Sequence, residues 1–153
     1  MTRQLSLYLL LATLALAAPP VATVSSSGSL SLNGVTLAPN GVPSWPLVPG
    51  DTLATSAAPA VILFQDRTRL TVEKNSKLKL DRDGGRLLVR LLEGALAYHL
   101  APSSQLRFAS LPSPPAPQGK LSIKDNQLIA APPGTAQLAG VPRTSPPAIS
   151  SFR

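Results

Sequence analysis

Between Gly50 and Ser110 the chain consists of short apolar or alternating segments, which begin about every nine residues and are separated by turn residues. Residues 60–64 form a continuous apolar run, which predicts a strand buried on both faces. Residues 69–73 and 77–81 alternate between polar and apolar side chains, as strands with one buried face do. The spacing is typical of a β-sandwich, roll or barrel. We therefore predict an all-β fold, a single β-sandwich or roll of short antiparallel strands.

The alternation also assigns side chains to the core. A slip of one residue would turn every apolar side chain of a strand toward water, so the pattern defines the register of strand pairing. The side chains expected to point inward are Leu70, Val72, Leu78, Leu80, Leu96, Tyr98, Leu100, Leu106 and Phe108.

Short groups of turn residues predict three hairpins. Asn33-Gly34 divides the alternating residues 30–37, and Asp83-Gly84-Gly85 separates residues 77–81 from residues 86–92. Asp125-Asn126 lies between residues 120–124 and 127–131. Asn, Asp and Gly are favoured at these places because the central residues of a two-residue hairpin turn need positive φ.

The first 17 residues resemble a secretory signal peptide. Arg3 supplies a positive start, an apolar run extends from Leu5 to Leu16, and Ala15-Leu16-Ala17 offers small residues for cleavage before Ala18. The run is shorter than the roughly 20 residues that span a bilayer. We expect an exported protein, periplasmic or extracellular, with no transmembrane span in the mature chain. Retention of the segment as an N-terminal anchor is the alternative.

Composition divides the rest of the chain into three parts. Residues 18–29 are small and Ser-rich, which predicts a flexible leader, and residues 30–131 form the expected β domain. Nine of the 17 prolines follow Leu111, and residues 132–153 form a Pro-rich tail. We expect this tail to be disordered, because it has few large apolar groups to offset the entropy of ordering.

The absence of cysteine and the excess of basic residues limit the possible chemistry. Without Cys the chain has no disulfide, no thiolate metal site and no thiol nucleophile. The formal net charge of +7 favours contact with polyanions. For an exported protein the available polyanions are cell-wall polymer and anionic lipid, and we expect no nucleic acid as partner.

The order of turns and strands resembles the FecR domain family. The matching features are Gly-Asp-x-Leu-x-Thr at 50–55, an apolar strand ending at Phe64, Asp66 in a turn, Asn75-Ser76, and Glu93-Gly94 after a Leu-rich strand. The resemblance covers about residues 50–110 and implies an all-β domain outside the cytoplasmic membrane. The best-known members are membrane-spanning regulators that relay a receptor's state to a sigma factor.

Two departures from that family pattern are visible. We expect this chain to lack the cytoplasmic segment and spanning helix, so that it does not carry a signal inward alone. Arg67 stands where the family has a turn glycine after Asp66, which predicts an altered turn or strain at positive φ.

Eight basic residues fall within 24 residues and form the candidate binding face for a polyanion or partner. The alternation places Arg69, Lys77 and Lys79 on the outward face of neighbouring strands. The alternative is a solvated face whose lysines prevent aggregation between strand edges. The eight residues are Arg67, Arg69, Lys74, Lys77, Lys79, Arg82, Arg86 and Arg90.

No constellation of catalytic or metal-binding residues can be assembled from this sequence. His99 is the only histidine and is expected on the surface, opposite the face of Tyr98. Asp81 and Asp83 with the following glycines could suggest a calcium loop, but the third carboxylate and the bidentate Glu of such loops are missing. We predict no enzyme, no catalytic residue, no metal and no cofactor.

The sequence thus favours an exported, non-enzymatic FecR-like β module that binds an envelope component or a protein partner. The alternative is a structural or interaction subunit of a cell-envelope assembly, or an accessory to envelope signalling. Such a subunit would dock its partner through the Pro-rich tail or by adding a strand at a sheet edge.

Overall fold

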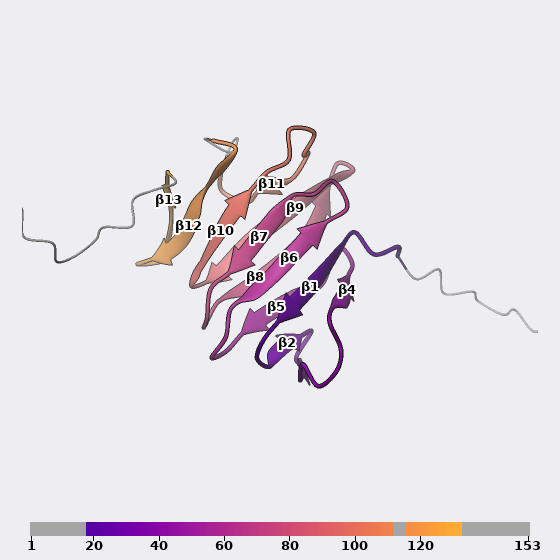
Figure 1. The fold of residues 1–153 in the computed structure, drawn as a ribbon. Helices are drawn as coiled ribbons and strands as arrows, with labels where there is room; N and C mark the ends of the chain where they lie inside the picture. Colours follow the sequence, from indigo (N-terminus) through magenta and orange to yellow (C-terminus); the bar gives the residue numbers. More distant parts are fainter. Residues whose placement is uncertain (1–17, 112–115, 133–153) are drawn as a thin grey trace, which may run out of the picture.

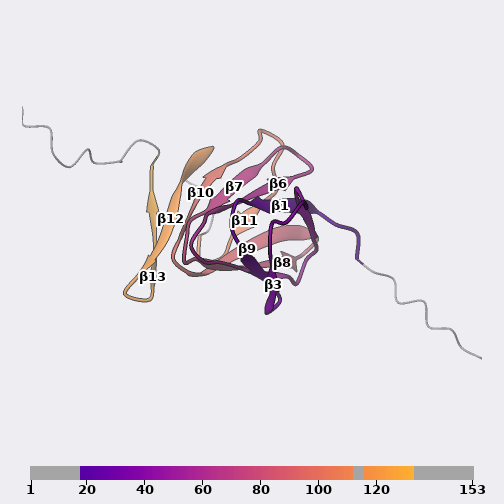
Figure 2. The ribbon, with the colours of Figure 1, turned by 60° about the horizontal axis from the view of Figure 1, so that its bottom comes forward.

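The computed structural model describes residues 18–111 and 116–132. The predicted signal peptide of residues 1–17 and the tail from residue 133 onward lie outside the described residues. Within them every regular element is a strand, and the strands form two sheets that stack as a sandwich (Figures 1 and 2). The predicted all-β sandwich is confirmed. No helix in the described ranges is long and apolar enough to cross a membrane.

The two sheets have seven and six strands. Sheet A has the order β13 (Gln127–Ala131), β12 (Gln118–Lys124), β10 (Ala95–His99), β7 (Arg69–Val72), β6 (Ala60–Phe64), β1 (Ala22–Ser26) and β4 (Trp45–Leu47). Sheet B has the order β11 (Arg107–Phe108), β9 (Arg86–Glu93), β8 (Lys77–Asp83), β5 (Thr52–Thr55), β2 (Leu30–Leu32) and β3 (Val35–Leu37). All neighbours are antiparallel except β11 and β9, which are parallel.

The core lies between the sheets and consists of the inward side chains of both. Leu70, Val72 and Leu96 of sheet A are fully buried, as are Leu78 and Leu80 of sheet B. Each such side chain contributes roughly 1.5–3 kcal/mol through burial. The alternation predicted for these strands is therefore confirmed.

Tyr98 of sheet A and Phe108 of sheet B meet across the core, with ring centroids 5.0 Å apart. Both rings are buried, as the sequence predicted, and burial raises the pKa of the Tyr98 hydroxyl. Leu106 is buried too, whereas Leu100 is half-buried immediately after the end of β10. The aromatic pair joins the two sheets near the side on which β11 lies.

Two sequence expectations are wrong. Residues 60–64 are not buried on both faces, because β6 alternates and its Leu63 is 50% exposed on the outer face of sheet A. Residues 18–29 are not a flexible leader throughout, because Ala22–Ser26 forms β1 between β6 and β4. Val24 of β1 is completely buried between β6 and β4, so contacts with distant strands order this small, Ser-rich segment.

The three predicted hairpin turns are confirmed, with positive φ at Asn33 and Gly34, Gly84 and Gly85, and Asp125 and Asn126. Arg67 also has positive φ, 71°, in the turn between β6 and β7. The Asp66 carboxylate accepts a hydrogen bond from the Thr68 N–H at 2.8 Å. This contact stabilises a turn that must be strained at Arg67, as the missing glycine predicted.

The β8–β9 hairpin is bounded by two crossings between the sheets. The segment Lys74-Asn75-Ser76 carries the chain from β7 in sheet A to β8 in sheet B, and Gly94 returns it from β9 to β10. The two crossings are adjacent: a Cβ added to Gly94 would lie 2.2 Å from Ser76 Oγ and 2.8 Å from the Asn75 carbonyl oxygen. Glycine is therefore required at 94 both for its φ of 77° and for this close approach.

Candidate binding surfaces

The eight predicted basic residues do not form one face. Arg69 projects from β7 in sheet A, whereas Lys77 and Lys79 project from β8 in sheet B, on the opposite side of the sandwich. The prediction that these three share an outward face is wrong. The segments are neighbours in sequence, but the chain changes sheet between them, and periodicity within one strand carries no information about that change.

The remaining five basic residues are dispersed around the sandwich. Arg67 lies in the β6–β7 turn and Lys74 in the crossing to β8. Arg82 is on the same side of β8 as Leu80 but is exposed near the hairpin end. Arg86 and Arg90 lie on β9, where Arg90 is directly opposite Lys79.

Acidic residues are interspersed among the cations of sheet B. Lys79 forms an ion pair with Asp81 at 3.4 Å, and both side chains are partly exposed. Asp83 is directly opposite Arg86, and Glu93 is opposite Lys77 beyond a β-bulge. Exposed pairs of this kind contribute at most about 1 kcal/mol each, but they neutralise the local field. The outer face of sheet B is therefore of mixed charge.

In the part of the chain that the structure describes, the single histidine pairs with no acidic side chain. His99 is exposed on β10, and its Nδ1 lies 3.2 Å from Oε1 of Gln118. Asp81 and Asp83 project from β8 with no third carboxylate near them, and the described part of the chain holds no cluster of three His, Cys, Asp or Glu residues suited to a metal. His99 is therefore a surface residue of β10, as the sequence predicted.

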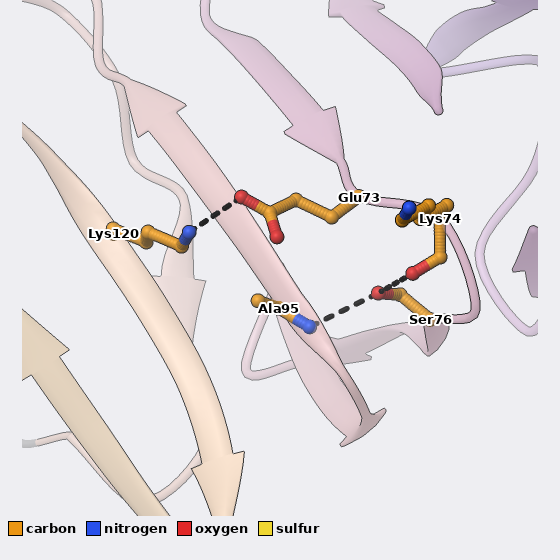
Figure 3. A network of polar contacts seen from close by, with 5 residues as sticks. All are labelled: Glu73, Lys74, Ser76, Ala95 and Lys120. Atoms are coloured by element: carbon orange, nitrogen blue, oxygen red, sulfur yellow. Dashed lines mark hydrogen bonds and ion pairs between the residues drawn. The ribbon is translucent and has the colours of Figure 1, made fainter. Parts of the chain in front are cut away.

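Two buried hydroxyl groups lie where the chain crosses between the sheets. Thr55 Oγ1 accepts a hydrogen bond from the Ser76 N–H at 3.0 Å and donates to the Glu73 carbonyl oxygen. Ser76 Oγ accepts the Ala95 N–H at 3.0 Å and lies 3.3 Å from the Lys74 carbonyl oxygen (Figure 3). Both hydroxyls are used to satisfy backbone groups, so neither is available as a nucleophile.

Asp51, near the start of the Gly-Asp-x-Leu-x-Thr segment, also has its side chain bonded to groups of the protein. Its carboxylate accepts hydrogen bonds from the Asn33 side-chain amide at 2.7 Å and from the Val48 N–H at 2.8 Å. The residue is 9% exposed and joins the β2–β3 turn to the start of β5. The polar residues of this motif are thus structural, and they connect strands that are far apart in sequence.

Replacing Thr55 by valine preserves the shape of the side chain but removes the acceptor for the buried Ser76 N–H. We expect a loss of about 1–3 kcal/mol in the free energy of unfolding, measured by urea denaturation, because a buried donor is left unsatisfied. The control is Thr55→Ser, which keeps the hydroxyl and should lose about 1 kcal/mol or less. If Thr55→Val lost no stability while Thr55→Ser did, the methyl group would matter and the hydroxyl would not.

Among residues 18–111 and 116–132, the outer face of sheet A carries one ion pair, between Lys120 and Glu73 at 2.5 Å (Figure 3). It connects β12 to the end of β7 across β10, and both side chains are nearly half exposed. The same face also carries the exposed Leu63 and Ile129, together with the exposed polar side chains of Arg69, His99 and Gln118.

The strand β13 is an open edge of sheet A, and Figure 2 shows the β12–β13 hairpin at one side of the sandwich. Gln127 and Lys124 flank the two-residue turn and exchange backbone hydrogen bonds. In an antiparallel pair every second residue bonds to the partner strand, so Gln127 and Ile129 bond to β12. The backbone N–H and C=O groups of Leu128 and Ala130 consequently point away from β12. No other strand of the described residues pairs with them, so they present donors and acceptors to an added strand.

Sequence reasoning predicted this hairpin but did not place β13 at an edge. The strand Gln-Leu-Ile-Ala-Ala contains neither charge nor proline, the usual protections of an edge. The other edge strands in the described ranges are shorter, with three, three and two residues in β4, β3 and β11, and β4 contains Pro46. The signal that could have identified the site is an uncharged strand followed immediately by prolines.

Comparison of the chain with protein-family models, with curated proteins and with solved structures gives no match.

Proposed function

We propose that this chain is an exported, non-enzymatic β module of the FecR type, which binds a protein partner in the cell envelope. The partner contributes an extended segment that adds to sheet A at β13. The observation that carries the proposal is the unprotected edge at Leu128 and Ala130, where two residues direct backbone donors and acceptors outward. Strand addition is a general mode of peptide recognition, in which main-chain hydrogen bonds supply affinity.

The distribution of charge favours this function over contact with a polyanion. A polyanion would need a continuous basic surface, whereas the candidate basic residues lie on both faces and on connecting turns. Those on sheet B alternate with Asp81, Asp83 and Glu93, which would repel the same polymer. An added strand at β13 meets no acidic side chain on β13 itself.

The non-enzymatic character is supported by the use of the polar groups. Thr55, Ser76 and Asp51 hold the backbone at the junctions between strands, and the ring of His99 forms a hydrogen bond with the side-chain amide of Gln118. Reactive groups would have to be free and convergent to form a catalytic site.

The decisive experiment blocks the edge without changing the hairpin. In Ala130→Pro the lost N–H is one that points away from β12, and proline is tolerated on edge strands. The matched control is Thr36→Pro on β3, where Asn33-Gly34 places Thr36 in the same outward-bonding position of a hairpin edge. Peptides selected from a random linear display library would be titrated against both variants and the full chain by fluorescence anisotropy.

We expect Ala130→Pro to weaken binding of the selected peptides at least about tenfold, and Thr36→Pro to leave it unchanged. Bound peptide should slow hydrogen exchange at the amides of Leu128 and Ala130. Equal loss in both variants, or no loss in Ala130→Pro, would contradict the proposal. Binding of anionic vesicles that survives Ala130→Pro and falls steeply with salt would favour a polyanion as the partner.

A further inference from the structure

A groove of about 600 Å³ lies beside β13, between the β12–β13 hairpin of sheet A and the second half of β9 in sheet B. Ile123 and Leu128 line it from the hairpin, and Leu91 and Leu92 line it from β9. Leu92 is 39% exposed there, beside the β-bulge. The groove thus contains four aliphatic side chains that the sandwich does not fully cover.

Arg90 is the one charged residue among those lining this groove. It is exposed, and within the described ranges it takes part in neither of the two ion pairs. Its neighbour across the strands is Lys79, whose ammonium group is paired with Asp81. Like charges directly opposite each other are unfavourable, so a carboxylate beside Arg90 would be stabilised.

A strand added to β13 would pass over this groove. The side chains of Leu128 and Ala130 are on the same side of the hairpin as the buried Leu121, because Ala130 pairs with Leu121 and Leu128 with Ile123. Alternate side chains of an added strand would continue that side, two residues apart, and would therefore face the groove. The other side chains would lie beside Ile129 on the outer face.

We propose that the segment accepted at β13 is an amphipathic strand of a partner protein. It places aliphatic side chains against Leu92 and Leu128 and the carboxylate of an Asp or Glu side chain on the Arg90 guanidinium. This inference rests on the proposed function and specifies the chemistry of the partner. The recognition therefore combines main-chain hydrogen bonds for affinity with one charged and several apolar contacts for specificity.

Charge argues against a second copy of this chain as the occupant. The chain carries a net charge of +7, and pairing of two β13 strands would bring together hairpins that both carry Lys120 and Lys124. The only acidic residue of the hairpin is Asp125, at its tip. Two copies would thus leave Arg90 without a carboxylate and add repulsion between like charges.

The test uses synthetic peptides of about nine residues, long enough to cover β13, with both ends blocked so that no terminal carboxylate is present. Leu and Val occupy alternate positions, and one glutamate is moved along the peptide; each peptide has a partner with Gln in place of Glu. The peptides are titrated against the full chain, Ala130→Pro, Arg90→Gln, and the control Arg86→Gln. Arg86 lies on the same strand as Arg90 but outside the groove.

We expect at least one Glu peptide to bind the full chain about tenfold more tightly than its Gln partner. Arg90→Gln should abolish this preference, and Arg86→Gln should keep it. If Glu and Gln peptides bind equally but still require an unblocked β13, the inference fails while the proposed function stands.

Two further outcomes would overturn the inference in other ways. If no peptide binds at all, both the inference and the proposed function fail. A dimer in sedimentation velocity that Ala130→Pro dissociates would make a second copy the occupant of the edge.

Discussion

Replacing Gly94 by alanine is expected to lower the free energy of unfolding by about 3–5 kcal/mol, one of the largest effects that a single methyl group could have here. The new Cβ would lie 2.2 Å from Ser76 Oγ and 2.8 Å from two backbone atoms of the facing crossing. A flexible side chain could move aside, but the carbonyl of Asn75 and the Cα of Ser76 cannot move without disturbing both sheets. Urea denaturation monitored by circular dichroism measures the loss.

Gly85→Ala is the matched control for this substitution. Gly85 has φ of 81°, close to the 77° of Gly94, but a Cβ added there meets nothing within 4 Å. It should therefore cost only the conformational penalty of about 1–2 kcal/mol. Similar losses in the two variants would show that backbone conformation alone explains the glycine at 94, and that the close approach of the crossings is unimportant.

Truncation of two adjacent residues in β6 should have very different effects. Ile62→Ala is expected to cost about 2–5 kcal/mol, because Ile62 is 1% exposed and its removal leaves a cavity between the sheets. Leu63→Ala should cost less than about 1 kcal/mol, because Leu63 points to the outer face of sheet A and is 50% exposed. Thermal or urea unfolding of the two variants side by side provides the comparison.

The same two variants also test whether sheet A is covered on its inner face alone or on both faces. A large loss in Leu63→Ala would mean that something covers the outer face in solution, as the continuous apolar run first indicated. A small loss in Ile62→Ala would contradict the sandwich itself, since Ile62 lies between Val24 and Leu70 in neighbouring strands.

Much of the fold could be predicted because its causes are local. The alternation in β7 and β8 assigns Leu70, Val72, Leu78 and Leu80 to the core regardless of what the strands pair with. Turn chemistry is equally local: Asn33-Gly34 and Asp125-Asn126 adopt the positive φ values that two-residue hairpins need. The candidate site was predictable only as far as the β12–β13 hairpin, whose two strands are adjacent in sequence.

The errors in prediction arise where contacts between distant residues decide the structure. Ala22–Ser26 has the composition of a linker, yet it becomes an inner strand because β6 and β4 supply backbone partners on both sides. Arg69 and Lys77 were assigned to one face because they lie in successive strands, but the crossing at Lys74-Asn75-Ser76 puts them on opposite faces. Neither outcome is encoded in the few residues around it.

The sequence by itself determined most of the strands between residues 50 and 110, the side chains of those strands that point inward, and the positions of the hairpin turns. These properties depend on backbone preferences and on the two-residue period of a strand. Only the tertiary structure decided which strands share a sheet. The same strand order makes β13 an edge strand and places it beside a groove that Arg90 helps to line. The physical reason is that sheet membership depends on pairing between remote segments, whose backbone groups are chemically alike and whose partners are selected by the packing of the whole core.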